Sequence, residues 1–168
     1  MPQPVNYRGM ALLIPDNDSE WKEFYEHARA HRLVVRKCTA CGLMRYPALH
    51  ACPWCMSLGW SWQTLSGKGT IHSYEIVHHA IQPGFKDSTP YATILVELDE
   101  QRGAPTADEG LRLIANLVKA DGSFEDTAKV AIGKRVSVVF QDLADHMALP
   151  QFTLSGEPDQ GRVWRLGG

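Results

Sequence analysis

Residues 38–55 read CTACGLMRYPALHACPWC and contain all four cysteines of the chain. They form two Cys-x2-Cys pairs separated by ten residues, Cys38 with Cys41 and Cys52 with Cys55. Each pair can place two thiolates around a tetrahedral ion, and a closed site of four thiolates suits zinc. The spacing therefore predicts one structural zinc ion, with a single iron ion as the alternative for the same ligands.

The predicted metal site has a stabilising role, because four thiolates leave no coordination position open for a substrate. If all four cysteines bind the metal, no thiol remains to act as a nucleophile. His50 lies two residues before Cys52 and is an alternative ligand, but the four cysteines suffice without it. The chain also contains no G-x-S-x-G, P-loop or G-x-G-x-x-G motif.

The composition is that of an ordinary globular protein, with 168 residues of which 44% are hydrophobic and 21% charged. Lys and Arg number 17 against 19 Asp and Glu, so the net charge of −2 gives no general attraction to nucleic acid. No apolar run approaches the ~20 residues that cross a bilayer, and the N-terminal residues do not resemble a secretory signal. We expect no membrane association and a cytoplasmic location, where paired cysteines indicate metal binding.

The N-terminal part of the chain reads as an arm followed by one helix. Residues 1–15 are expected to be irregular. Apolar side chains recur at helical spacing between Trp21 and Ala28, which predicts a helix from about Ser19 to Ala30. We divide the chain into an arm and helix (1–35), a zinc ribbon (36–60), an OB-fold barrel (61–154) and a tail (155–168).

From Trp60 onward, short β-branched and apolar runs alternate with turns that contain glycine or proline. The expected strands are 61–65, 70–79, 91–98, 111–118, 135–140 and 152–154. Residues 66–69, SGKG, are expected to form a hairpin turn, because they lack the spacing and the following helix of a phosphate loop. The predicted fold class is mainly β, with an N-terminal helix, a zinc ribbon and a five- to six-stranded OB-fold barrel.

Short segments between about residues 20 and 154 occur in an order that matches a known family. They are Trp21 with Phe24, LVVRKCTACG (33–42), Tyr46-Pro47, CPWC (52–55), SGKGTIHSY (66–74), Pro90-Tyr91, VELDE (96–100), LIANL (113–117) and IGKRV (132–136). In these segments the chain resembles small acyl-CoA-associated proteins in which a rubredoxin-like zinc ribbon precedes an OB-fold and which accompany thiolase-like enzymes. The chain departs from that pattern at Gln101 to Asp108, an insertion that lengthens one hairpin.

The resemblance implies a noncatalytic subunit of a hetero-oligomer whose thiolase-like partner carries the catalytic residues. The complex would act on a coenzyme A thioester by condensation, thiolytic or aldol cleavage, or acyl transfer. A CoA site needs cations for its phosphates, and the candidates nearest the ribbon are Arg36, Lys37, Arg45 and Lys68. Phe85, in a Pro-Gly-Phe loop, and Trp164, in the tail, are the candidates for partner contacts.

Two other functions remain open from the sequence. An OB-fold can bind single-stranded nucleic acid by stacking bases on aromatic side chains, for which Trp60, Trp62 and Tyr74 are available, although the acidic balance opposes it. A free-standing enzyme would use His72 or His78 as a general base. Both histidines lie on one face of an expected strand, but the sequence places no second catalytic group beside them.

Overall fold

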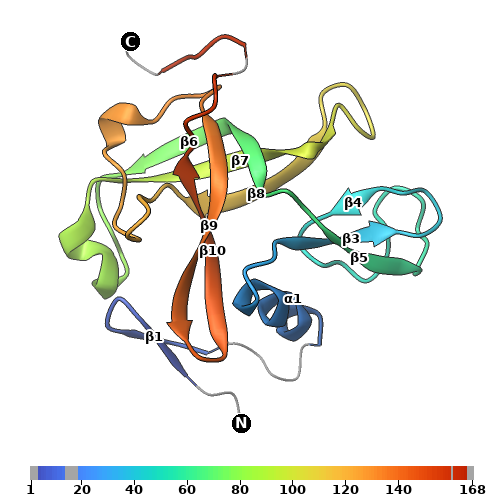
Figure 1. Ribbon diagram of the computed structural model, residues 1–168, viewed down its shortest axis with the longest axis horizontal. Helices are drawn as coiled ribbons and strands as arrows, with labels where there is room; N and C mark the ends of the chain where they lie inside the picture. The colour runs from blue at the N-terminus through green and yellow to red at the C-terminus, as the bar shows by residue number, and fades with distance from the viewer. Residues whose placement is uncertain (1–3, 14–18, 160, 166–168) are drawn as a thin grey trace.

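The computed structural model describes residues 4–13, 19–159 and 161–165 (Figure 1). Within these residues the chain forms one α-helix, two short 3-10 helices and ten strands in three sheets. The elements are β1 (Val5–Tyr7), β2 (Met10–Leu12), α1 (Ser19–Arg29), β3 (Val34–Cys38), β4 (Met44–Arg45), β5 (Trp60–Thr64), β6 (Lys68–Val77), η1 (Pro83–Ser88), β7 (Tyr91–Arg102), β8 (Gly110–Asn116), η2 (Thr127–Lys129), β9 (Arg135–Ala144) and β10 (Met147–Leu154). The described α-helix is neither long nor apolar enough to cross a membrane.

The largest sheet has five antiparallel strands in the order β10-β9-β6-β7-β8. Its two edges meet just beyond β8, where Leu117 pairs with Phe152 of β10 in a parallel bridge. The sheet is thus a nearly closed five-stranded barrel, and the predicted fold class of a mainly β chain with a zinc ribbon and an OB-fold is confirmed.

The barrel core follows from residues that alternate along each strand. In β7 every second residue from Ala92 to Leu98 is buried, because successive side chains of a strand point to opposite faces. β6 carries a bulge between Ile71 and Ser73, which allows the long strand to bend around the core. The largest side chains at the centre come from four strands and the segments beside them: Ile71, Ile94, Val96, Leu98, Leu117, Val136 and Phe152.

The ribbon is a separate three-stranded sheet in the order β4-β3-β5. β5 pairs with β3 along its whole length, from Val34 opposite Thr64 to Cys38 opposite Trp60. The expected hairpin between β5 and β6 is therefore wrong. Leu65 still donates its backbone N–H to the carbonyl of Leu33, so the chain leaves the ribbon sheet at residues 66–67 and enters the barrel at Lys68, the first residue of β6.

Helix α1 lies between the ribbon sheet and the β9–β10 hairpin (Figure 1). It buries Phe24 and Ala28, which lie one helical turn apart on the same face. Glu23, on the side of the helix toward β5, accepts a hydrogen bond of 2.7 Å from the indole Nε1 of Trp62. The helix thus connects the two β modules through one apolar face and one polar contact.

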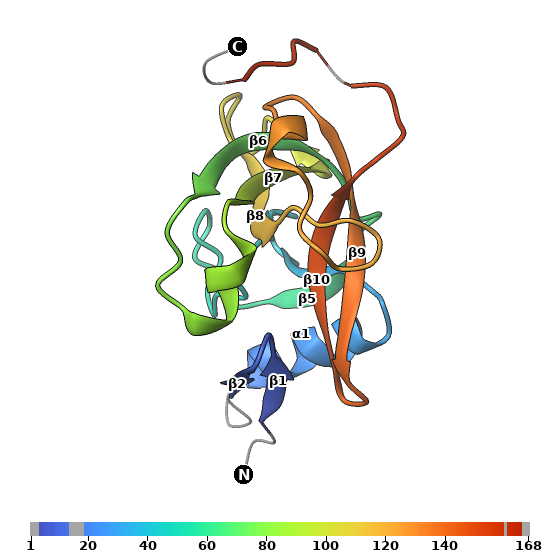
Figure 2. The same ribbon diagram turned by 90° about the vertical axis from the view of Figure 1, so that its left-hand side faces the viewer.

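The N-terminal arm is not irregular throughout, as its sequence suggested, because β1 and β2 form a hairpin. Its turn is made by Arg8 and Gly9, which both have positive φ angles, 53° and 76°. Tyr7 is buried and packs edge-on against Phe85, with ring centroids 5.9 Å apart. The contact between Tyr7 and Phe85 thus holds this hairpin against the rest of the chain. The hairpin lies at the opposite end of the molecule from the C-terminal tail (Figure 2).

Candidate metal centre and its surroundings

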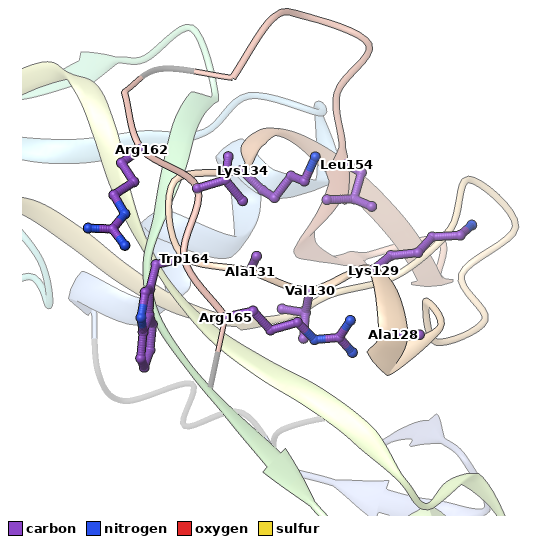
Figure 3. Close-up of a pocket in the computed structure, with 10 residues that line it drawn as sticks. Ala128, Lys129, Val130, Ala131, Lys134, Leu154, Arg162, Trp164 and Arg165 are labelled. Carbon is purple, nitrogen blue, oxygen red and sulfur yellow. The ribbon is translucent and has the colours of Figure 1, made fainter. Parts of the chain in front are cut away.

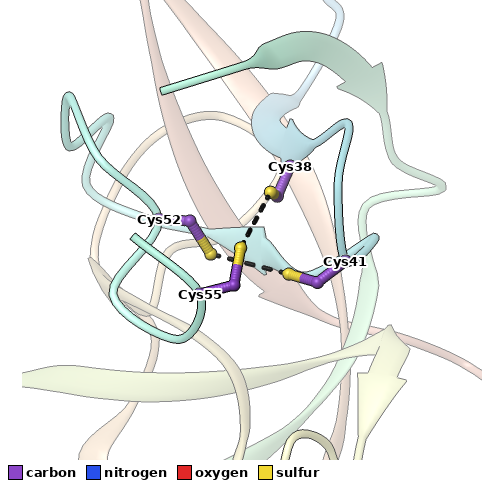
Figure 4. A group of neighbouring side chains, drawn as sticks. All are labelled: Cys38, Cys41, Cys52 and Cys55. Carbon is purple, nitrogen blue, oxygen red and sulfur yellow. Dashed lines mark hydrogen bonds between the residues drawn. The ribbon is translucent and has the colours of Figure 1, made fainter. Parts of the chain in front are cut away.

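The four cysteine side chains converge from two loops (Figure 4). Cys38 ends β3, Cys41 lies in the following turn, and Cys52 and Cys55 lie in the loop before β5. The Sγ atoms of Cys38 and Cys55 are 3.6 Å apart, as are those of Cys41 and Cys52, and all four atoms lie within 4.8 Å of one another. Zn–S bonds of about 2.3 Å in a tetrahedron require sulfur atoms about 3.8 Å apart, so the arrangement fits a structural zinc ion.

The two loops repeat the same backbone turn around the metal site. Gly42 donates its N–H to the carbonyl of Cys38 at 3.0 Å, and Met56 donates to that of Cys52 at 2.9 Å. The N–H groups of Cys38 and Cys52 in turn bond to the carbonyls five residues later. Both turns need a positive φ at the equivalent position, which is 78° at Gly42 and 61° at Met56. Gly42 signals this turn in the sequence, whereas Met56 does not, because bulky residues rarely adopt that conformation.

Backbone N–H groups around the sulfur atoms favour the thiolate form. Hydrogen bonds from the backbone of Cys41 and Ala40 lower the pKa of Cys38 to about 6. Burial acts to raise the pKa of Cys52, but hydrogen bonds from the backbone of Cys55 and Trp54 lower it overall. The Leu43 N–H lowers the pKa of Cys41, yet desolvation and the neighbouring sulfur atoms raise it to about 12. Four adjacent thiolates therefore need a bound cation to coexist.

Two of the cations expected to meet CoA phosphates are buried beneath the metal loop. Arg36 and Arg45 face each other across β3 and β4, and both donate to the carbonyl of Leu49, at 3.2 and 3.1 Å. The guanidinium of Arg36 also lies 3.7 Å from the ring centroid of Trp60. These contacts hold the loop that leads to the second cysteine pair.

The other two cations lie apart from each other. Lys37 follows Arg36 on β3 and therefore points to the opposite face of the ribbon sheet. Lys68 begins β6, is half exposed, and forms an ion pair with Glu157. The structure thus does not bring the four predicted cations into one site.

The two residues expected at a partner interface differ in their surroundings. Phe85 is half-buried in an aromatic cluster, with ring centroids 5.4 Å from Tyr91 and 6.0 Å from Phe124. Its ring therefore packs within the chain. Trp164 keeps an exposed ring, while its backbone exchanges two hydrogen bonds, of 2.8 and 3.0 Å, with Ile132. These bonds attach the tail to its own barrel.

The tail covers an open pocket of about 590 Å³. Its lining has an apolar floor and four cations: Ala128, Lys129, Val130, Ala131, Lys134, Leu154, Arg162, Val163, Trp164 and Arg165. Figure 3 shows Arg162 and Trp164 pointing to one side of the tail and Arg165 to the other. Both lysines already have carboxylate partners, Lys129 with Glu125 at 3.1 Å and Lys134 with Asp159 at 2.7 Å.

A second groove, of about 410 Å³, lies where the ribbon meets the barrel. Its lining comes from the ribbon, from the end of β7, from the start of β8 and from the connection between these two strands: Leu43, Met44, Arg45, Tyr46, Leu49, Pro53, Trp54, Gln101, Ala104, Pro105, Glu109, Gly110, Leu111 and Arg112. The Gln101 side chain bonds to both the N–H and the carbonyl of Met44, at 2.8 and 2.9 Å. Gln101, the first residue of the predicted 101–108 insertion, thus fastens the ribbon to the barrel, a role that its sequence did not reveal.

The aromatic side chains that could stack bases are half-buried, whereas the two histidines that could act as a general base are exposed. Trp60 and Trp62 are half-buried and pack on each other with ring centroids 5.3 Å apart. Tyr74 is half-buried as well. His72 lies on β6 and His78 just beyond it, both exposed. The indole rings of Trp60 and Trp62 therefore pack against each other within the ribbon instead of forming an open stacking platform.

Comparisons with known proteins agree with this architecture. Residues 26–60 match the family model described as the rubredoxin-like zinc ribbon domain of ChsH2, and residues 62–141 match its C-terminal OB-fold domain. In the solved structure titled Ltp2-ChsH2(DUF35) aldolase, a chain with 31% sequence identity superposes with a TM-score of 0.67, covering 84% of this chain and 98% of that one.

Two curated relatives extend the comparison. A DUF35 domain-containing scaffold protein of Methanothermobacter thermautotrophicus is 31% identical over 68% of this chain and 76% of its own length. A probable enoyl-CoA hydratase alpha subunit of Thermomonospora curvata is 35% identical over 77% of this chain, which spans only 35% of that protein. The chain therefore belongs to the DUF35 family of ChsH2-type proteins, which combine a rubredoxin-like zinc ribbon with an OB-fold domain.

Proposed function

We propose that this chain is a noncatalytic, zinc-binding accessory subunit of a cytoplasmic complex that acts on an acyl-CoA thioester. A thiolase-like partner would carry the catalytic groups. The observation that carries this proposal is the match over 98% of a chain in an aldolase whose title names two components, Ltp2 and ChsH2. Relatives named as a hydratase alpha subunit and as a scaffold protein are consistent with a supporting role.

In this proposal Cys38, Cys41, Cys52 and Cys55 bind one zinc ion. The ion would supply no chemistry to the reaction, because four thiolates complete a tetrahedral shell. Its role is to hold the two loops of the ribbon in one arrangement, which stabilises the folded ribbon and presents a constant surface to the partner.

The four cations predicted to contact CoA have two different roles in this proposal. Arg36 and Arg45 bond to backbone carbonyls under the metal loop, so we assign them to loop support. Lys37 and Lys68 remain as the predicted phosphate contacts, with Lys68 exchanging Glu157 for the ligand. Of the two residues predicted at the interface, Trp164 keeps an exposed ring and remains a candidate, whereas Phe85 packs internally.

The test is to purify the tagged chain from its native source and to measure the mass of the intact complex. The expected result is a stable complex with an enzyme subunit of thiolase size, and acyl-CoA turnover only when both chains are present. Recovery of the chain alone, or with nucleic acid, would contradict the proposal. Turnover by the purified chain alone that disappears on His72→Ala or His78→Ala would instead identify a free-standing enzyme.

A further inference from the structure

Exposed apolar side chains are concentrated on the loop that carries the second cysteine pair. Of the nine large hydrophobic residues that are exposed in the described part of the chain, four fall within ten residues. These four define the knuckle patch: Leu49 (47% exposed), Trp54 (58%), Met56 (72%) and Leu58 (70%). Apolar residues scattered singly over a surface need no explanation, but such a concentration marks an interaction surface.

The knuckle patch is held in place before any partner binds. The carbonyl of Leu49 accepts hydrogen bonds from both buried arginines of the ribbon, and Met56 is bonded to Cys52 within the metal loop. The Ser57 hydroxyl accepts the N–H of Gly59, which closes the segment toward β5. Because the loop is already ordered, binding loses little conformational entropy. Tryptophan is also among the residues that contribute most to interfaces.

The knuckle patch continues into a concave surface. Leu49 and Trp54 also line the groove of about 410 Å³ between the ribbon and the barrel, together with Pro53, Pro105 and Leu111. A loop with exposed apolar side chains, beside a groove lined by both apolar and charged side chains, is complementary to a shaped protein surface, whereas a lipid bilayer offers only a flat one. The geometry therefore favours a protein as the occupant.

The charge of this region indicates the sign of that protein's surface. From residue 27 to residue 74 the chain has six Lys and Arg residues and no Asp or Glu, although the whole chain has a net charge of −2. Four thiolates with one Zn²⁺ carry two negative charges, which leaves an excess of positive charge in this part. Two copies of the region would repel each other, while an acidic surface would attract it.

We propose that the knuckle patch and the adjoining groove are the docking surface for the catalytic subunit, which presents an apolar area bordered by acidic side chains. This inference rests on the proposed function and specifies which face of the chain contacts the catalytic subunit. The partner's apolar side chains cover Trp54 and Leu58, and its acidic side chains are attracted by the net positive charge of the ribbon, to which the buried Arg36 and Arg45 and the half-buried Lys37 contribute. The outer face of the barrel, where Ile114 is exposed, stays free.

Site-specific cross-linking tests this assignment in the intact, zinc-loaded chain. A photoreactive phenylalanine derivative is placed at Trp54 or Leu58 and, as matched controls, at Ile81 or Ile114, which are equally exposed apolar positions outside the ribbon. The expected result is a cross-link from positions 54 and 58, but from neither control, to one subunit that peptide masses identify as an acyl-CoA enzyme.

Other cross-linking results overturn the inference in distinguishable ways. A cross-link to that enzyme from Ile81 or Ile114 alone would reject the docking face and leave the proposed function intact. Absence of a cross-linked enzyme from all four positions would reject both. A cross-link between two copies of the chain from position 54 or 58 would replace the partner with a second copy.

Substitution gives an independent measurement. Trp54→Glu and Leu58→Glu are expected to reduce the amount of enzyme that co-purifies by about tenfold, because central apolar side chains dominate interface energy, whereas Ile114→Glu leaves it unchanged. All three side chains are exposed, so zinc content stays at the level of the unsubstituted protein. Equal losses from the three variants would overturn the inference. So would binding of the chain alone to anionic phospholipid vesicles that is lost in Leu58→Glu.

Discussion

Arg135 and Asp99 form a two-point ion pair at one end of the barrel. The Arg135 Nη1 atom lies 2.8 Å from Oδ1 of Asp99, and Nη2 lies 2.6 Å from Oδ2. Nη1 also donates to the Thr70 hydroxyl at 3.1 Å, and Nη2 to the Glu157 carboxylate at 3.1 Å. Arg135 is only 3% exposed, so one buried guanidinium connects β6, β7, β9 and the start of the tail.

Asp99→Asn is expected to lower the free energy of unfolding by about 3 kcal/mol at neutral pH, because it leaves the buried guanidinium without its main counter-ion. Urea denaturation measures the difference. Asp142→Asn is the matched control, since its pair with His31 is exposed on both sides and is expected to contribute less than about 0.5 kcal/mol. Equal effects of the two substitutions would mean that the ion pair between Arg135 and Asp99 does not stabilise the fold more than an exposed pair does.

The same ion pair predicts a dependence of stability on pH. Hydrogen bonds from Arg135 hold the pKa of Asp99 below its ordinary value of 3.8. The pair therefore contributes fully above that ordinary value, and its contribution is lost as the pH falls through the lowered pKa of the folded protein. The difference in unfolding free energy between the unsubstituted protein and Asp99→Asn should stay constant near neutral pH and shrink in strong acid. A difference that grows in acid would contradict this account.

Phe152→Ala tests the closure of the barrel. Phe152 is almost fully buried and pairs with Leu117 at the seam between β8 and β10. Removal of its ring is expected to lower the free energy of unfolding by about 3–5 kcal/mol. Ile114→Ala, on the exposed face of β8, should change it by less than about 0.5 kcal/mol. Thermal and urea unfolding of both variants gives the comparison, and a small effect of Phe152→Ala would mean that the seam is loosely packed.

Gly67→Ala tests the crossing from the ribbon to the barrel. Gly67 has a φ of 74°, and a Cβ atom there would lie 2.1 Å from a methyl carbon of Val138. Backbone strain and this clash are expected to lower the free energy of unfolding by about 2–4 kcal/mol. Gly156→Ala is the matched control, because it meets no atom within 4 Å and needs no positive φ. Equal stability of the two variants would show that the crossing can adjust.

Cys52→Ser tests the metal centre. Cys52 is fully buried at the metal site, so its loss is expected to reduce zinc from one ion per chain to a small fraction and to lower the melting temperature by several degrees. Elemental analysis and tryptophan fluorescence measure both effects. His50→Ala is the control, since His50 is exposed and four cysteines already converge on the site. Zinc that persists in Cys52→Ser and falls in His50→Ala would mean that the histidine is a ligand.

Much of this fold follows from local sequence patterns. Two Cys-x2-Cys pairs predict a metal ribbon because the ligands within each pair are neighbours in the chain. Likewise, alternate residues of β7 predict a half-buried strand whatever lies across from it. The hairpin expected at residues 66–69 failed for the opposite reason. β5 pairs with β3 and not with β6, the strand that follows it in the chain, and this pairing depends on the tertiary structure.

In the candidate site, too, some features follow from the sequence and others depend on the tertiary structure. The sequence by itself determined the four cysteines of the candidate metal centre, the order of helix, ribbon and barrel, and the excess of positive charge in residues 27–74. Only the tertiary structure decided that Arg36 and Arg45 are buried under the metal loop, because strand register places them opposite each other. It also decided that Trp54 and Leu58 stay exposed while Phe85 finds aromatic neighbours. Ligand spacing is a property of a short segment, whereas burial depends on which distant segments pack against a side chain.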